Sequence, residues 1–289
     1  MSFLRRFGFA LLLSLGPLPC AQTPTDISAN LTFTTVDVPG AGYTGVWGIN
    51  KTGDMVGNYG QDDNIDSHGF VYSNGVFTYF DYPGESVTLP TGINDFGVIV
   101  GRAGQNPVVG FLYDGTSFTN MRHRNDSATF TNGINNAAVV VGGTGTIYTT
   151  KGFQLRDGKF KLLNVPGQYI YVNGTGVNNV GTIVGWTDND GFTCRGSTCK
   201  IIDFPGASTT EPLGINDGGV IVGWYRIPFG CLGCGFALKN GKYVSFKYPG
   251  ADTYATGINA SGQVVGQYTF DYQTFHGFVT SPILSADFR

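Results

Sequence analysis

Aromatic and polar side chains follow a Val-Gly pair that recurs along the chain. The two residues after each pair are Asn58-Tyr59, Arg102-Ala103, Gly143-Thr144, Trp186-Thr187, Trp224-Tyr225 and Gln267-Tyr268. The surrounding residues repeat from copy to copy, but the two residues at this position differ. Such differences indicate positions that serve a function and not the shared fold. Exposed aromatic rings can stack on sugars or hold peptide side chains at low entropic cost. We therefore predict a ligand surface, with packing between repeats as the competing interpretation; its residues would be Tyr59, Arg102, Trp186, Trp224, Tyr225 and Tyr268.

Carboxylates that could act as acid or base are few, because the chain has only two glutamates, Glu85 and Glu211. A polysaccharide hydrolase or lyase could use Glu211 with Arg102 or Arg226. Paired carboxylates of glycosidases lie roughly 5–9.5 Å apart. Glu85 and Glu211 lie at the entry to the second and fifth of six repeats, which a closed ring would place opposite each other. We therefore expect a binding protein, and Glu211 is the single weak candidate for catalysis.

Four cysteines follow the N-terminal segment, as the pairs Cys194/Cys199 and Cys231/Cys234. Two local disulfides and a four-thiolate zinc site are the two interpretations. The repeat described below places the two pairs at opposite ends of strands roughly 15–20 Å long. Zinc–sulfur bonds of about 2.3 Å cannot span that distance. We predict two disulfides, no metal and no cofactor.

Histidines and aspartates offer weaker signals. We expect His68, His123 and His276 to be hydrogen-bonded structural or loop residues. The segment with Asp62, Asp63 and Asp66, and the run Asp188-Asn189-Asp190-Gly191, resemble calcium loops faintly. Both lack the terminal bidentate glutamate of such loops, so polar turns are the preferred interpretation.

The candidate residues described above belong to a sequence repeat. Gly-Ile-Asn or Gly-Val-Asn occurs at Gly48–Asn50, Gly92–Asn94, Gly133–Asn135, Gly176–Asn178, Gly214–Asn216 and Gly257–Asn259, in steps of 38 to 44 residues. Such a period indicates one supersecondary unit copied several times. Each unit continues with Val-Gly, Gly-Phe, usually a turn such as Asn-Gly, and an aromatic stretch that mostly ends in Pro-Gly. These landmarks predict four short strands and no helix.

Six four-stranded units predict an all-β, six-bladed β-propeller, with repeats that begin near residues 45, 89, 130, 173, 211 and 254. The last unit lacks a fourth strand, and residues 31–40 (LTFTTVDVPG) have the pattern of one. We expect this N-terminal strand to complete the last blade and close the ring, which leaves no free sheet edge. An open solenoid is the structural alternative. Residues 22–289 would form a single domain.

Residues 1–21 have the pattern of a signal peptide, with Arg5-Arg6 before an apolar run and a cleavage site after Ala21. No later stretch is long enough for a membrane span. The net charge of −3 and the absence of a basic run make nucleic acid an improbable partner. We expect a monomer that is secreted, periplasmic or held at the cell surface.

The combined landmarks resemble the bacterial HAF-type extracellular repeat proteins. The resemblance rests on His68-Gly69-Phe70 and His276-Gly277-Phe278, on Gly-Ile-Asn and Val-Val-Gly, and on Phe-Asp-Tyr-Pro-Gly. Four repeats depart from it, because Val109, Lys151, Asp190 and Cys234 replace the histidine. The resemblance implies an exported repeat protein and brings no catalytic residues.

These observations favour an exported, non-catalytic binding protein that holds a glycan, a cell-envelope polymer or a protein partner on one propeller face. An extracellular polysaccharide hydrolase or lyase of the same fold is one alternative. A purely structural surface repeat protein is the other.

Overall fold

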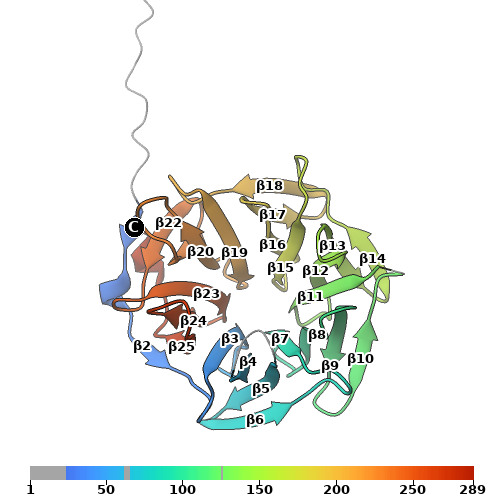
Figure 1. The fold of residues 1–289 in the computed structure, drawn as a ribbon. Helices are drawn as coiled ribbons and strands as arrows, with labels where there is room; N and C mark the ends of the chain where they lie inside the picture. The colour runs from blue at the N-terminus through green and yellow to red at the C-terminus, as the bar shows by residue number, and fades with distance from the viewer. Residues whose placement is uncertain (1–23, 62–65, 125) are drawn as a thin grey trace, which may run out of the picture.

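Six mainly antiparallel sheets surround a common axis, and in each sheet the strand that ends at the Gly-Ile or Gly-Val landmark lies nearest that axis (Figure 1). The computed structural model describes residues 24–61, 66–124 and 126–289. Each sheet is a propeller blade, in which successive strands lie progressively farther from the axis. The predicted all-β, six-bladed fold is therefore confirmed. Helical structure in the described part of the chain consists of two short 3-10 turns, η1 (Ser28–Asn30) and η2 (Ser285–Phe288). No described helix could cross a membrane.

The first three blades follow one another along the chain. Blade 1 contains β3 (Tyr43–Ile49), β4 (Met55–Gly60), β5 (His68–Ser73) and β6 (Val76–Phe80). Blade 2 contains β7 (Thr88–Ile93), β8 (Ile99–Ala103), β9 (Val109–Tyr113) and β10 (Phe118–Met121). Blade 3 contains β11 (Ala128–Ile134), β12 (Val140–Gly145), β13 (Thr150–Arg156) and β14 (Lys159–Leu162).

Blade 4 also follows directly along the chain, whereas blades 5 and 6 each include a strand from the N-terminal side of blade 1. Blade 4 contains β15 (Val172–Val177), β16 (Thr182–Thr187), β17 (Gly191–Arg195) and β18 (Thr198–Ile202). Blade 5 contains β19 (Thr209–Ile215), β20 (Ile221–Arg226), β21 (Cys234–Lys239) and β22 (Lys242–Phe246), with β1 (Thr25–Asp26) as an added edge strand. Blade 6 contains β23 (Asp252–Ile258), β24 (Val264–Thr269), β25 (His276–Thr280) and β2 (Phe33–Thr35).

An N-terminal strand closes the ring, as the repeat pattern predicts. β2 pairs antiparallel with β25, with Phe33 opposite Thr280 and Thr35 opposite Phe278 (Figure 1). The sequence gives no sign of β1, which pairs in parallel with β22 over only two residues. A strand that short has too little pattern to be detected from composition or alternation.

The Val-Gly glycines bring the first two strands of each blade into unusually close contact. In blade 3, a Cβ atom added to Gly142 would overlap the carbonyl oxygen of Phe130, and it would lie 2.8 Å from the ring of Phe153. A Cβ atom added at the five equivalent glycines would likewise overlap a carbonyl oxygen of the first strand; they are Gly57, Gly101, Gly185, Gly223 and Gly266. At all of these except Gly223 it would also lie within 3 Å of the buried phenylalanine ring. The phenylalanine of every Gly-Phe pair is fully buried, as Phe153 is. Each blade is therefore built around one glycine and one buried ring.

The asparagines of the Gly-Ile-Asn copies join the blades at the end of the axis where β19 and the other first strands finish. Asn178 Oδ1 accepts a hydrogen bond from Thr182 N at 2.9 Å within its own turn. Its Nδ2 donates to the carbonyl oxygen of Asn216 in the next blade at 3.1 Å. Asn94, Asn135, Asn216 and Asn259 also donate to the asparagine carbonyl of the next blade. Each asparagine therefore stabilises its own turn, and the bond between blades is a second role that one repeat alone does not reveal.

Replacing Asn178 with alanine should lower the free energy of unfolding by about 2–4 kcal/mol. The variant leaves the half-buried amide hydrogen of Thr182 without its acceptor, which costs about 1–3 kcal/mol. It also removes one of the two hydrogen bonds that the Asn216 carbonyl oxygen accepts, about 0.5–1.5 kcal/mol, because Gly219 N still donates to that oxygen. Urea unfolding followed by circular dichroism measures the change, with exposed Asn164 replaced by alanine as the control. Equal stability of the two variants would contradict a role in holding blades together.

Candidate functional site

A cavity of about 530 Å³ lies on the axis of the propeller. Ile147 and Tyr171 belong to its lining and come from loops at the end where the blades are connected to one another. The asparagines of the Gly-Ile-Asn copies, which join the blades, line a separate and smaller hollow. This hollow shares no lining residue with the cavity. The cavity is therefore entered from the face that carries the connections between blades. Its volume falls in the range of small-molecule sites.

The cavity is built from three equivalent positions of the blade. One is the residue before each Gly-Ile-Asn copy, where the pairing register shifts by a β-bulge. These residues are Trp47, Thr91, Asn132, Thr175, Leu213 and Thr256. The other two positions face each other across the first and second strands, as Leu89 with Arg102, Asn173 with Trp186, Glu211 with Trp224 and Tyr254 with Gln267.

All three tryptophans of the chain line this cavity: Trp47, Trp186 and Trp224. Each is partly exposed, and each comes from a different blade. The structure thus brings together three of the residues predicted for the ligand surface, Arg102, Trp186 and Trp224. Trp47 was not singled out, because it lies on the bulge of the first strand and not after Val-Gly. The rarity of tryptophan in the chain was the signal that could have found it.

The three tyrosines predicted for the same surface lie elsewhere. Tyr225 is 6% exposed and stacks on Phe204 at 3.5 Å between ring centres. Tyr268 is 5% exposed and stacks on Tyr248 at 3.7 Å. Tyr59 packs 5.1 Å from Tyr79 and does not line the cavity. Successive residues of a strand point to opposite faces of a sheet. For this reason the first residue after Val-Gly can reach the cavity while the second packs between blades.

Glu211 has an unusual environment for a carboxyl group. Its Oε2 accepts a hydrogen bond from Trp224 Nε1 at 3.1 Å. Burial raises the pKa of Glu211 from 4.5 to about 7, while the Trp224 donor and the nearby Arg226 guanidinium act in the opposite direction. Arg226 lies 5.9 Å from the centre of the Trp224 ring. Near neutral pH, Glu211 can therefore donate or accept a proton.

Arg102 stands on the other side of the cavity, in blade 2, whereas Glu211 is in blade 5. Its guanidinium lies 5.4 Å from the centre of the Phe130 ring, a cation–π contact. Desolvation lowers the pKa of Arg102, but a guanidinium remains charged in proteins. Glu85 is exposed and does not line the cavity, so the two glutamates do not form a catalytic pair there.

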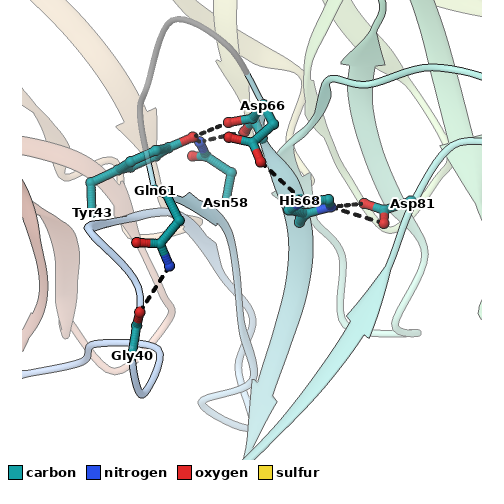
Figure 2. Close-up of polar contacts among 8 residues, drawn as sticks. Gly40, Tyr43, Asn58, Gln61, Asp66, His68 and Asp81 are labelled. Atoms are coloured by element: carbon teal, nitrogen blue, oxygen red, sulfur yellow. Dashed lines mark hydrogen bonds and ion pairs between the residues drawn. The ribbon is translucent and has the colours of Figure 1, made fainter.

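A polar network in blade 1 holds Trp47 in the cavity wall. Trp47 Nε1 donates to Asn58 Oδ1, and Asn58 Nδ2 donates to Ser67 Oγ at 2.9 Å. Figure 2 shows Asn58 beside Tyr43, whose hydroxyl donates to the carbonyl oxygen of Asp66 at 3.1 Å. Asn58 occupies the position that Trp186 and Trp224 hold in blades 4 and 5. In blade 1 this position therefore supports a tryptophan instead of supplying one.

All three histidines pair with aspartates, as expected for structural residues. His68 Nδ1 lies 3.0 Å from Asp81 Oδ2 (Figure 2). His123 pairs with Asp126 at 2.8 Å, and His276 pairs with Asp37 at 2.7 Å. In the part of the chain that the structure describes, no group of histidine, cysteine, aspartate or glutamate side chains could hold a metal ion. Asp62 and Asp63, from the faint calcium-loop pattern, lie outside the described residues.

The four cysteines form the two predicted disulfides. Cys194 and Cys199 are directly opposite each other in β17 and β18. Cys231 and Cys234 close the loop between β20 and β21. This second loop supports the cavity wall, because Gly233 O accepts a hydrogen bond from Thr253 N at 2.9 Å, next to the cavity residue Tyr254. Disulfides persist in oxidising compartments outside the cytosol.

No protein-family model and no curated protein matches this chain. Several solved structures share its fold at low sequence identity. A protein assigned as a gluconolactonase has a TM-score of 0.53 and 13% identity, over 88% of this chain and 93% of its own. A gluconolactonase from Xanthomonas campestris has a TM-score of 0.51 and 11% identity, over 87% and 90%. A variant of AofleA from Arthrobotrys oligospora, in which three arginines are replaced with alanine, has a TM-score of 0.54 and 10% identity, over 86% of each chain.

These similarities define the class of the molecule, a β-propeller, and at such identities they show the fold alone. The chemistry must be argued from the cavity residues themselves.

Proposed function

We propose that the protein is an exported, non-catalytic glycan-binding protein of the HAF type, and that it holds its ligand in the central cavity. The observation that carries the proposal is the convergence of all three tryptophans on one cavity. Aromatic faces next to amide and hydroxyl groups suit a sugar, which presents apolar C–H faces and polar edges. Phe130, Tyr171 and Tyr254 add further rings to the wall.

The shape of the site favours a short ligand or a chain end. The blades enclose the cavity on all sides, and the hollow at the opposite end of the axis is separate from it. A polymer therefore cannot lie across the molecule inside the cavity, but its terminal residues can enter from the face that carries the blade connections.

Export is the second part of the proposal. The two disulfides support an oxidising environment, such as the periplasm or the cell surface. The signal-peptide pattern at residues 1–21 and the HAF-type landmarks agree with this location, although residues 1–21 lie outside the described residues.

Replacing Trp186 or Trp224 with alanine should weaken glycan binding at least about 30-fold, as expected for a central aromatic contact worth about 2 kcal/mol. A glycan array identifies the ligand, and isothermal titration calorimetry measures its affinity for each variant. Phe96 is 75% exposed in the turn between β7 and β8, at the other end of the axis, and its alanine variant is the matched control. Unchanged affinity in both folded tryptophan variants would refute the site.

A hydrolase or lyase is the second candidate, and the raised pKa of Glu211 is the observation that favours it. A general acid works best with a pKa near the working pH. Turnover of a bound glycan that is lost in Glu211→Gln, while binding is retained, would establish the enzyme. Binding without turnover would support the non-catalytic protein.

A further inference from the structure

Arg102 is a cation in the cavity wall whose charge has no counterpart. Among the described residues, no carboxylate forms an ion pair with it and no acceptor takes a hydrogen bond from its guanidinium. The other cationic side chain beside the cavity differs, because Arg226 Nε donates to Leu232 O at 3.3 Å and its charge acts on Glu211. Elsewhere Lys247 pairs with Asp252 at 2.9 Å. Arg102 instead contacts the face of Phe130 and faces the cavity.

The surroundings of Arg102 favour a ligand that brings a negative charge to it. Neighbouring protein desolvates the guanidinium, which lowers its pKa without removing its charge. A desolvated charge is destabilising unless it is paired and hydrogen-bonded. The positions around it in the wall are occupied by uncharged residues, Leu89, Thr91, Phe130 and Asn132. No group among the described residues therefore pairs with this charge, and a ligand that enters the cavity can supply the partner.

Glu211 does not fill that role. It is the only other charged residue among the described residues that line the cavity, and its blade stands opposite that of Arg102 in the ring. Glu211 is already bonded to Trp224, and Arg226 is the cation that influences it. The cavity thus presents the Arg102 guanidinium on one wall, and Trp186, Trp224 and the Glu211 carboxyl group on the other.

We infer that the cavity selects a sugar that carries a carboxylate, such as a uronic acid residue, and that Arg102 binds this carboxylate as a bidentate ion pair. The inference rests on the proposed glycan-binding function and specifies its ligand. A guanidinium fork matches the two oxygens of a carboxylate, and such charge-assisted pairs are stronger than neutral hydrogen bonds. The single positive charge is balanced by one carboxylate, while the tryptophans contact the apolar faces of the sugar.

The test compares trigalacturonic acid with its methyl ester, which has the same rings and no charge. Calorimetry on the full chain should show that the wild type binds the acid roughly 10- to 100-fold more tightly than the ester. In Arg102→Gln the ratio of the two affinities should fall towards one. The exposed Arg156, in β13, supplies the control variant Arg156→Gln, which should keep the wild-type ratio.

Equal affinity of the wild type for acid and ester would overturn the inference, and so would an undiminished ratio in folded Arg102→Gln. A sulfated sugar of equal length serves as a third probe, and tighter binding of that probe than of the acid would overturn the assignment of a carboxylate. The wild-type comparison decides even if the variant does not fold. If a neutral glycan binds and depends on Trp224 but acids gain nothing, only this inference fails. If no glycan binds at all, the proposed function fails as well.

Discussion

Replacing Gly142 with alanine should destabilise the protein by more than about 4 kcal/mol, among the largest effects of a single substitution. The added methyl group has no room, because it would overlap the Phe130 carbonyl oxygen of β11 and press on the buried ring of Phe153. Backbone cannot move aside as a flexible side chain can, so β11 must shift and take the cavity residue Phe130 with it. Thermal and urea unfolding measure the loss.

A matched glycine elsewhere separates this steric effect from a general intolerance of alanine. Gly218 lies in the turn between β19 and β20, and the nearest atom to an added Cβ would be Asn216 Oδ1 at 3.3 Å. We expect Gly218→Ala to change stability by less than about 1 kcal/mol. If Gly142→Ala proved equally mild, the close approach of the first two strands would not be a requirement of the blade.

Replacing Glu211 with glutamine should raise stability at pH 8 and leave it nearly unchanged at pH 4. Burial raises the pKa of Glu211 from 4.5 to about 7, so the folded state holds a proton that the unfolded state has already lost between these values. Stability therefore falls as the pH rises through this window, and the full loss, about 3 kcal/mol, is present above pH 7. Glutamine keeps an acceptor for Trp224 Nε1 and carries no charge.

Urea unfolding of wild type and Glu211→Gln at pH 4 and pH 8 measures this difference, and the exposed Glu85→Gln variant controls for net charge. A gain that is the same at both pH values would show that the substitution acts through packing and not through the ionisation of Glu211.

The fold was predictable because the same sequence landmarks recur in all six blades. Six copies of Gly-Ile-Asn and a displaced strand before the first copy define the ring and its closure. The disulfides followed from the same strand order, because it separates the two cysteine pairs. β1 was not predictable, because two residues carry no pattern of their own.

The cavity was only partly predictable, and the reason lies in strand geometry. The sequence pattern marked the positions after Val-Gly. The side chains of the consecutive residues Trp224 and Tyr225, however, point to opposite faces of the sheet. The register of the strands decides which of the two side chains reaches the axis. The bulge that aims Trp47 inward is also a property of the paired strands. The partnerless state of Arg102 depends on groups from other blades, which no single repeat contains.

The pairing of β2 with β25 also determines when during synthesis the ring of blades can close. Residues 33–35 are made early, yet the strand they pair with ends at Thr280. The ring can therefore be sealed only after the chain has been synthesised as far as β25. Until then the first and last blades expose unpaired edges, the state most open to association with another chain. Closure of the ring thus waits for the last strand of the sixth blade to form, and no earlier blade can substitute for it.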